Sequence, residues 1–154
     1  MENLRVQPDA IKLAAYLHDF GAYPKYSQSG IDHAIRSAEV ARVILNDFGA
    51  DQELINLIVK AIEGHMFYSA PDLTVPEAVV FHDADVLDFL GNVGIERIHS
   101  IIGIDDWTPT SRDAEILIGR FMRELPSDVI TQSGKNLAKD RVNEMQDYFS
   151  SHPI

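Results

Sequence analysis

The sequence predicts an all-α protein, a compact bundle of about six to seven helices, on three observations. Apolar residues recur every three or four positions along most of the chain, whereas the alternating pattern of a strand is hard to find. Proline, aspartate and glycine stand where helices commonly begin and end. The length of 154 residues, with 45% hydrophobic and 24% charged residues, is typical of one globular domain, so we expect residues 1–154 to form a single domain.

The first helix is predicted over about residues 8–20, because Pro8 suits a first helical turn and Gly21 a helix stop. Its apolar stripe includes Ala14 and places His18 on the inward face. A second helix is predicted over about residues 31–48, with Ile35, Ala38 and Leu45 inward.

The third helix is predicted to begin at Asp51 and to end near Gly64, which places His65 at its C-terminus. A loop at residues 66–75 separates it from a fourth helix over about residues 76–90, which Gly91 interrupts. The same patterns predict three further helices, over about residues 94–104, 112–125 and 136–149.

The charge and the residue types exclude several classes of function. The formal net charge is -11 and no basic run is present, so binding to long nucleic acids is not expected. The chain has no cysteine, which excludes disulfides and thiolate zinc sites. No segment has the length and apolarity of a membrane helix or a signal peptide, so we expect a cytoplasmic protein that does not bind membranes.

A histidine and an aspartate stand side by side at the end of the first predicted helix, as His18 and Asp19. Near a helix end, neighbouring side chains can reach one ion although they point about 100° apart. Taken alone, the dipeptide is more typical of a buried histidine followed by a helix-terminal aspartate than of a metal site.

The fourth predicted helix carries Asp85 on the same face as Phe81 and Phe89. A buried carboxylate must find a cation, a metal ion or several hydrogen-bond donors. The alternative to a metal is an arginine partner, such as Arg36 or Arg97. His82 and Asp83 flank this stripe, and we take them as groups that support the ligands or face solvent.

Two further histidines, His33 and His65, stand at the start of the second helix and the end of the third. Either could be an ordinary capping or surface residue. Together with the carboxylates they form a mixed nitrogen and oxygen set, which suits Mn²⁺, Fe²⁺, Zn²⁺ or Ni²⁺ better than Ca²⁺.

The order of these motifs resembles the HD superfamily of metal-dependent phosphohydrolases, in particular its small bacterial branch. The matching segments are residues 13–21, 32–45, 61–65, 77–97 and, more loosely, 137–149. In the family the His-Asp pair corresponds to His18 and Asp19, and the Asp of an Ala-Asp-x-Leu pattern, the last metal ligand, corresponds to Asp85. His33 and His65 resemble the extra histidines that hold a second metal or touch the substrate in some members.

The resemblance implies a metal-dependent phosphohydrolase with an HD-domain-like fold, which binds one or two divalent ions (Mn, Fe, Ni, Zn or Mg). It implies a small phosphorylated substrate, attacked by a metal-activated water. In this scheme Asp19 orients or deprotonates the water, and His65 binds a metal or stabilises the charge on the phosphate. Lys25 and Arg36 are the candidate phosphate contacts.

The sequence departs from the family pattern upstream of the His-Asp pair. The family supplies a first ligand histidine from an earlier helix, whereas only 17 residues precede His18 and none is a histidine. The loss of such a helix would expose apolar surface and favour homo-oligomers. This departure keeps open the alternative of a catalytically impaired HD-fold binding or regulatory module.

Of two oxidative alternatives, only one remains. A ferritin-like di-metal oxidase requires two Glu-x-x-His pairs, and the single pair Glu96 and His99 is inadequate for it. A dioxygen-dependent oxygenase on the HD-type scaffold would need iron at the same residues as the hydrolase.

Overall fold

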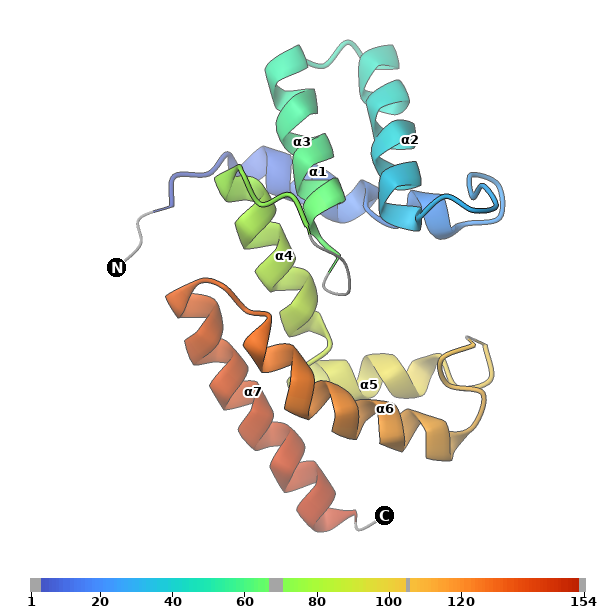
Figure 1. Cartoon of the computed structure of the whole chain (residues 1–154), viewed down its shortest axis with the longest axis vertical. Coiled ribbons are helices and arrows are strands. Elements are labelled where there is room, and N and C mark those ends of the chain that lie inside the picture. The colour runs from blue at the N-terminus through green and yellow to red at the C-terminus, as the bar shows by residue number, and fades with distance from the viewer. Residues whose placement is uncertain (1–3, 67–70, 105, 153–154) are drawn as a thin grey trace. The chain divides into compact units, whose positions relative to one another are not determined.

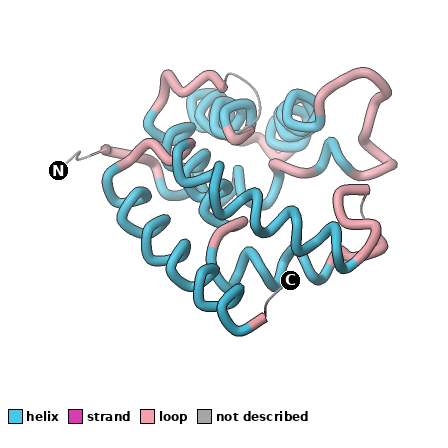
Figure 2. Tube along the Cα trace, turned by 60° about the horizontal axis from the view of Figure 1, so that its bottom comes forward, coloured by secondary structure: helices cyan, strands magenta, loops and turns pink. Residues whose placement is uncertain are grey.

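Helices make up all the regular secondary structure of the described residues, 4–66, 71–104 and 106–152, in the computed structural model (Figure 2). This confirms the predicted all-α class. Part of the predicted loop at residues 66–75, namely residues 67–70, lies outside the described residues. The helices in chain order are α1 (Pro8–Leu17), η1 (Phe20–Ala22), α2 (His33–Asp47), α3 (Gln52–Gly64), α4 (Pro76–Asp88), α5 (Gly91–Ser100), α6 (Ser111–Glu124), η2 (Leu125–Ser127) and α7 (Gln132–Ser151).

The chain divides into two compact units, Met1–His82 and Asp83–Ile154, and the boundary between them falls inside α4. The first unit holds α1, η1, α2, α3 and the N-terminal part of α4. The second unit holds the rest of α4 together with α5, α6, η2 and α7. The expectation of a single domain over the whole length stays a prediction.

In the first unit, α2 and α3 lie side by side and run antiparallel, joined by a short turn (Figure 1). Carboxylates begin both helices: Asp32 accepts a 2.8 Å hydrogen bond from the Ala34 N–H, and Asp51 one from the Glu53 N–H. Gly49, with φ +71°, supplies the left-handed residue that ends α2.

Small residues on α1 and α2 face larger aliphatic residues on α3 in the core of the first unit. Alanine allows helices to approach closely, and the branched side chains of α3 fill the space between them. The fully buried members of this core are Ala10, Ala14, Ala41, Ile55, Ile58, Ala61 and Ile62.

The structure corrects two details of the sequence analysis in this unit. Helix α1 ends at Leu17, not Phe20, because Asp19 leaves the helix at φ -102° and ψ 4°. Ile35, predicted to face inward on α2, is 53% exposed, since the buried stripe runs through Ala34, Ala38 and Leu45.

In the second unit, Gly91 begins α5, whereas the sequence analysis placed the start near Gly94. Leu90 is extended and Gly91 has φ +72°, so the chain turns at this point and enters the next helix directly. Leu90, Ile98, Ile118 and Met145 are fully buried and form the centre of this unit. Among the described residues, no helix is long and apolar enough to cross a bilayer.

Candidate metal centre

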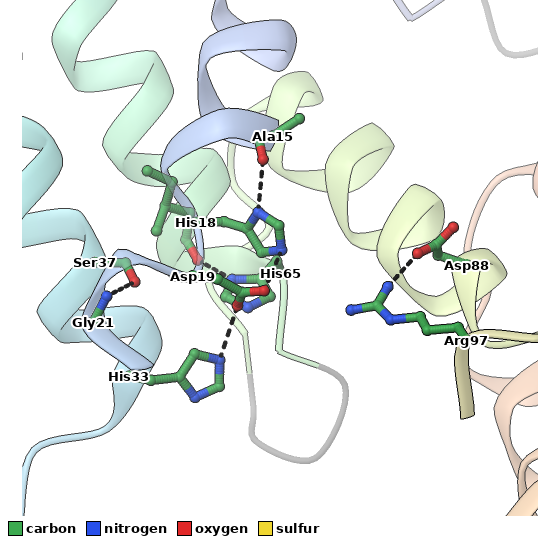
Figure 3. A network of polar contacts seen from close by, with 10 residues as sticks. Ala15, His18, Asp19, Gly21, His33, Ser37, His65, Asp88 and Arg97 are labelled. Atoms are coloured by element: carbon green, nitrogen blue, oxygen red, sulfur yellow. Dashed lines mark hydrogen bonds and ion pairs between the residues drawn. The ribbon is translucent and has the colours of Figure 1, made fainter. Parts of the chain in front are cut away.

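Three helix ends bring four polar side chains together in the first unit (Figure 3). His18 caps the C-terminal end of α1, and Asp19 follows it in the turn before η1. His33 is the first residue of α2, and His65 caps the C-terminal end of α3. These are four of the five metal ligands that the sequence analysis proposed.

Asp19 lies between two of the histidines. Its Oδ2 is 3.2 Å from Nε2 of His18, and its Oδ1 is 3.8 Å from Nε2 of His33. The His65 ring centroid lies 5.1 Å from that of His18 and 5.4 Å from that of His33. The carboxylate and the three imidazoles therefore form one cluster.

The cluster fits a divalent metal ion in its spacing and its donor types. Asp19, His33 and His65 each offer one ligand atom, and these atoms lie within 4.8 Å of one another. Ligands about 2.1 Å from a tetrahedral ion are about 3.4 Å apart, so side-chain movements of about 1 Å would close the set around an ion. Imidazole nitrogens and a carboxylate oxygen suit first-row transition ions.

Backbone carbonyls orient two of the imidazoles. Nδ1 of His18 lies 3.0 Å from the Ala15 carbonyl oxygen, and Nδ1 of His65 lies 2.5 Å from that of Ile62. A carbonyl can only accept, so Nδ1 carries a proton in both rings. Nε2 of His18 faces the Asp19 carboxylate, to which it donates when the ring is protonated, whereas Nε2 of the neutral His65 ring keeps a lone pair. This is the arrangement that histidine ligands of metals commonly have.

The environment keeps both ligand types in the protonation state that binds metal. Burial lowers the pKa of His65 to about 4, and the charges of His18 and His33 act in the same direction. Burial would raise the pKa of Asp19, but the hydrogen bond from His18 and the charges of the three histidines outweigh it and lower that pKa. Near neutral pH, His65 is therefore neutral and Asp19 ionised.

A close contact between η1 and α2 fixes the backbone next to Asp19. The Gly21 N–H donates a 2.8 Å hydrogen bond to the Ser37 hydroxyl, which is fully buried. A Cβ at Gly21 would lie 2.3 Å from the His33 carbonyl oxygen, so only glycine allows this approach. From the sequence, Gly21 is predicted only as a helix stop, and nothing marks Ser37 as a functional residue.

Asp85, the fifth predicted ligand, lies on α4 in the second unit and is half-buried. Its neighbours on the predicted stripe, Ala78, Phe81 and Phe89, are buried as expected. Arg97, one of the arginine partners considered for Asp85, forms an ion pair with Asp88 (Figure 3). The assignment of Asp85 as a metal ligand stays a prediction.

The two predicted phosphate contacts, Lys25 and Arg36, both contact Tyr26 in the first unit. Nζ of the exposed Lys25 is 5.1 Å from the centroid of the Tyr26 ring. Arg36 donates from Nε to the Tyr26 carbonyl oxygen at 2.6 Å and pairs with Glu39 at 2.7 Å. A guanidinium has five N–H donors, so these two contacts do not exclude a phosphate contact, and the proposed role of Arg36 stays a prediction.

His82 and Asp83 are buried, with 3% and 4% exposure, which rules out the solvent-facing alternative considered for them. In the first unit, Nδ1 of His82 lies 3.2 Å from the Gly64 carbonyl oxygen. In the second unit, Asp83 accepts hydrogen bonds from Ile130 and Thr131. Their burial could be predicted from the sequence, because α4 carries apolar residues on several sides. This pattern is typical of a helix that is buried on more than one face.

Comparison with known proteins adds a family match and two similar folds. The family model described as "HD domain" matches residues 1–90. The crystal structure of Bacillus subtilis YpgQ in complex with ADP is similar at 23% identity and a TM-score of 0.63, over 96% of this chain and 79% of that one. The Lin1889 protein from Listeria innocua is similar at 21% identity and a TM-score of 0.54, over 93% and 83%. No curated protein matches the chain.

Proposed function

The chain belongs to the HD domain family, whose members are generally metal-dependent phosphohydrolases, and on this basis we propose that it hydrolyses a small phosphoester or nucleotide with a metal-activated water. The observation that carries the proposal is the cluster at the ends of three helices. Asp19, His33 and His65 offer ligand atoms within 4.8 Å of one another, and His18 contacts Asp19.

One or two divalent ions would be held by His18, Asp19, His33 and His65, with Asp85 as the further ligand that the family pattern implies. Mn, Fe, Ni, Zn and Mg are the candidate metals, and the imidazoles favour the transition ions. When bound, such an ion supplies Lewis-acid chemistry: it lowers the pKa of water and polarises a phosphoryl oxygen.

In this proposal Asp19 acts on the attacking water as well as binding a metal. Its two oxygens face different histidines, so one can serve as a ligand while the other accepts a hydrogen bond or a proton from water. His65 is better suited to binding a metal than to stabilising charge, because its neutral ring presents a lone pair at Nε2.

Nucleoside phosphates are the first substrates to examine. The similar fold of YpgQ was obtained in complex with ADP, which is a small phosphorylated ligand. Lys25 and Arg36 supply positive charge in a chain whose formal net charge is -11. We expect these two cations to contact the phosphates, while the metal centre provides the chemistry.

The test combines metal analysis with phosphate release. Purified protein is stripped with EDTA and titrated with Mn²⁺ by calorimetry. Phosphate release is then measured with nucleoside mono-, di- and triphosphates and with p-nitrophenyl phosphate. We expect Asp19→Asn to reduce the rate by at least about 10²-fold, the low end for loss of a general base. His152→Leu, which removes an exposed histidine of the second unit, serves as the matched control.

The outcomes separate the two functions considered from the sequence. If the wild type binds metal and releases phosphate and Asp19→Asn does not, the hydrolase proposal stands. If the wild type binds none of Mn²⁺, Fe²⁺, Ni²⁺, Zn²⁺ or Mg²⁺, the proposal fails and the catalytically impaired binding module takes its place. Iron-dependent oxygen consumption without phosphate release would instead indicate an oxygenase.

A further inference from the structure

His82 is a buried histidine that the proposed hydrolysis does not use. It lies on α4 with 3% exposure, and a buried polar group is costly unless it forms hydrogen bonds. Its Nδ1 is 3.2 Å from the Gly64 carbonyl oxygen. Because a carbonyl only accepts, Nδ1 of His82 is the donor.

The carbonyl that receives this hydrogen bond belongs to the peptide unit that carries His65. Gly64 is the last residue of α3, and the last carbonyls of a helix have no partner within the helix. The Gly64 carbonyl and the His65 N–H share one rigid plane, which also contains the Cα atoms of both residues. A hydrogen bond to this carbonyl therefore fixes the point from which the His65 side chain extends.

Contacts within α3 hold the His65 backbone only weakly. The His65 N–H reaches the Ile62 carbonyl at 3.4 Å, near the outer limit for a hydrogen bond. Packing on α4 supplies the missing restraint: a Cβ at Gly64 would lie 3.0 Å from Cβ of Ala78. Ala78 and His82 are four residues apart and so lie on one face of α4, which holds the end of α3 at two points.

We infer that His82 is a positioning residue for the metal centre, which sets the orientation of His65 through the Gly64 peptide. The inference rests on the proposed function, since it gives His82 a role in metal binding. Groups that orient histidine ligands commonly change metal affinity by 10- to 100-fold when they are removed. His82 acts on the backbone and not on the ring of His65, so we expect the lower end of this range, about 10-fold.

The test replaces His82 with residues that keep or remove its donor. In His82→Asn the amide nitrogen can take the place of Nδ1, whereas in His82→Leu the donor is lost and the bulk retained. His82→Gln keeps an amide but places it farther along the side chain, where Nε2 lies in the histidine. It provides a polar comparison if the leucine variant does not fold. Circular dichroism melting checks the fold of each variant, and His152→Leu again serves as the control.

Two measurements are made on each folded variant. Mn²⁺ alone is titrated by calorimetry, and the side-chain ¹⁵N signals of His65 are recorded in metal-free protein. We expect Mn²⁺ affinity to fall about 10-fold in His82→Leu and His82→Gln and to stay near that of the wild type in His82→Asn. The His65 signals should move toward those of a mixture of the two ring tautomers in the first two variants only.

The inference is overturned if folded His82→Leu or His82→Gln binds Mn²⁺ like the wild type and leaves the His65 signals unchanged. Equal losses in His82→Asn and His82→Leu would also overturn it, because they would point to ring packing and not to the donor. If the wild type itself binds no metal, the proposed function fails, while the His65 signals of metal-free protein still test the role of His82.

Discussion

Acidification should destabilise the metal-free protein through His65, in a pH range set by its two pKa values. Burial lowers the pKa of His65 from 6.5 to about 4 in the folded protein. Between these values the unfolded chain binds a proton at this residue and the folded chain does not. The free energy of unfolding therefore falls as the pH is lowered from about 6.5 to about 4.

The size of the effect follows from the difference between the two pKa values. One pKa unit corresponds to about 1.4 kcal/mol, so the loss should be about 1.4 kcal/mol at pH 5.5 and about 3 kcal/mol at pH 4. The carboxylate of Asp19, whose pKa is also lowered, contributes in the same direction but only in more acidic solution.

The assay is equilibrium unfolding in urea with EDTA, at several pH values, for the wild type and for His65→Leu. Leucine does not titrate, so the difference between the two proteins isolates the contribution of His65 from that of the exposed carboxylates. We expect the wild type to lose stability more steeply than the variant over this range. Parallel curves would show that His65 is not a buried neutral histidine and would refute its assignment as a neutral imidazole ligand of the cluster.

Three further predictions concern the metal and the backbone contacts near α4 and η1. A divalent metal at 100 times its dissociation constant should raise the free energy of unfolding by about 2.7 kcal/mol, measured by thermal melting and reversed by EDTA. Gly21→Ala should lower both the melting temperature and the Mn²⁺ affinity, since its Cβ would lie 2.3 Å from the His33 carbonyl oxygen; unchanged values would show that η1 can move without cost. Asp83→Ala should lower the free energy of unfolding by about 3 kcal/mol, because it leaves the two buried donors of Thr131 and the part-buried N–H of Ile130 without their acceptor, whereas the exposed Asp140→Ala should change little.

Local chemistry explains why the helices could be predicted from the sequence more reliably than their ends. Asp51 before α3 and Gly49 after α2 act through their own backbone, so their effect is visible in the sequence. The end of α1 was predicted three residues late because Asp19 leaves the helix to meet His33, which is distant in sequence. Ile35 was predicted to face inward because the spacing of apolar residues alone does not distinguish a buried stripe that includes Ala34 from one displaced by a single residue.

The candidate ligands could be named from the sequence because the chemistry of metal binding restricts them to a few residue types. Without cysteine, only histidine and carboxylates can hold a transition ion, and few of them stand at apolar helix ends. The residues that orient these ligands carry no such signature. Ser37 is a common buried hydroxyl, and its role depends on the approach of Gly21 across the fold.

The order of His82 and Asp83 on α4 matches the helix ends that they meet. His82 donates to a carbonyl at the C-terminus of α3, where the helix dipole is negative, and Asp83 accepts N–H groups at the N-terminus of α7, where it is positive. A carboxylate at position 82 would face the Gly64 carbonyl oxygen, with no proton between the two oxygens. An imidazole at position 83 could accept a hydrogen bond from at most one of the donors that now bond to Asp83. The dipeptide is therefore not interchangeable with its reverse, although both have the same composition and the same helical spacing.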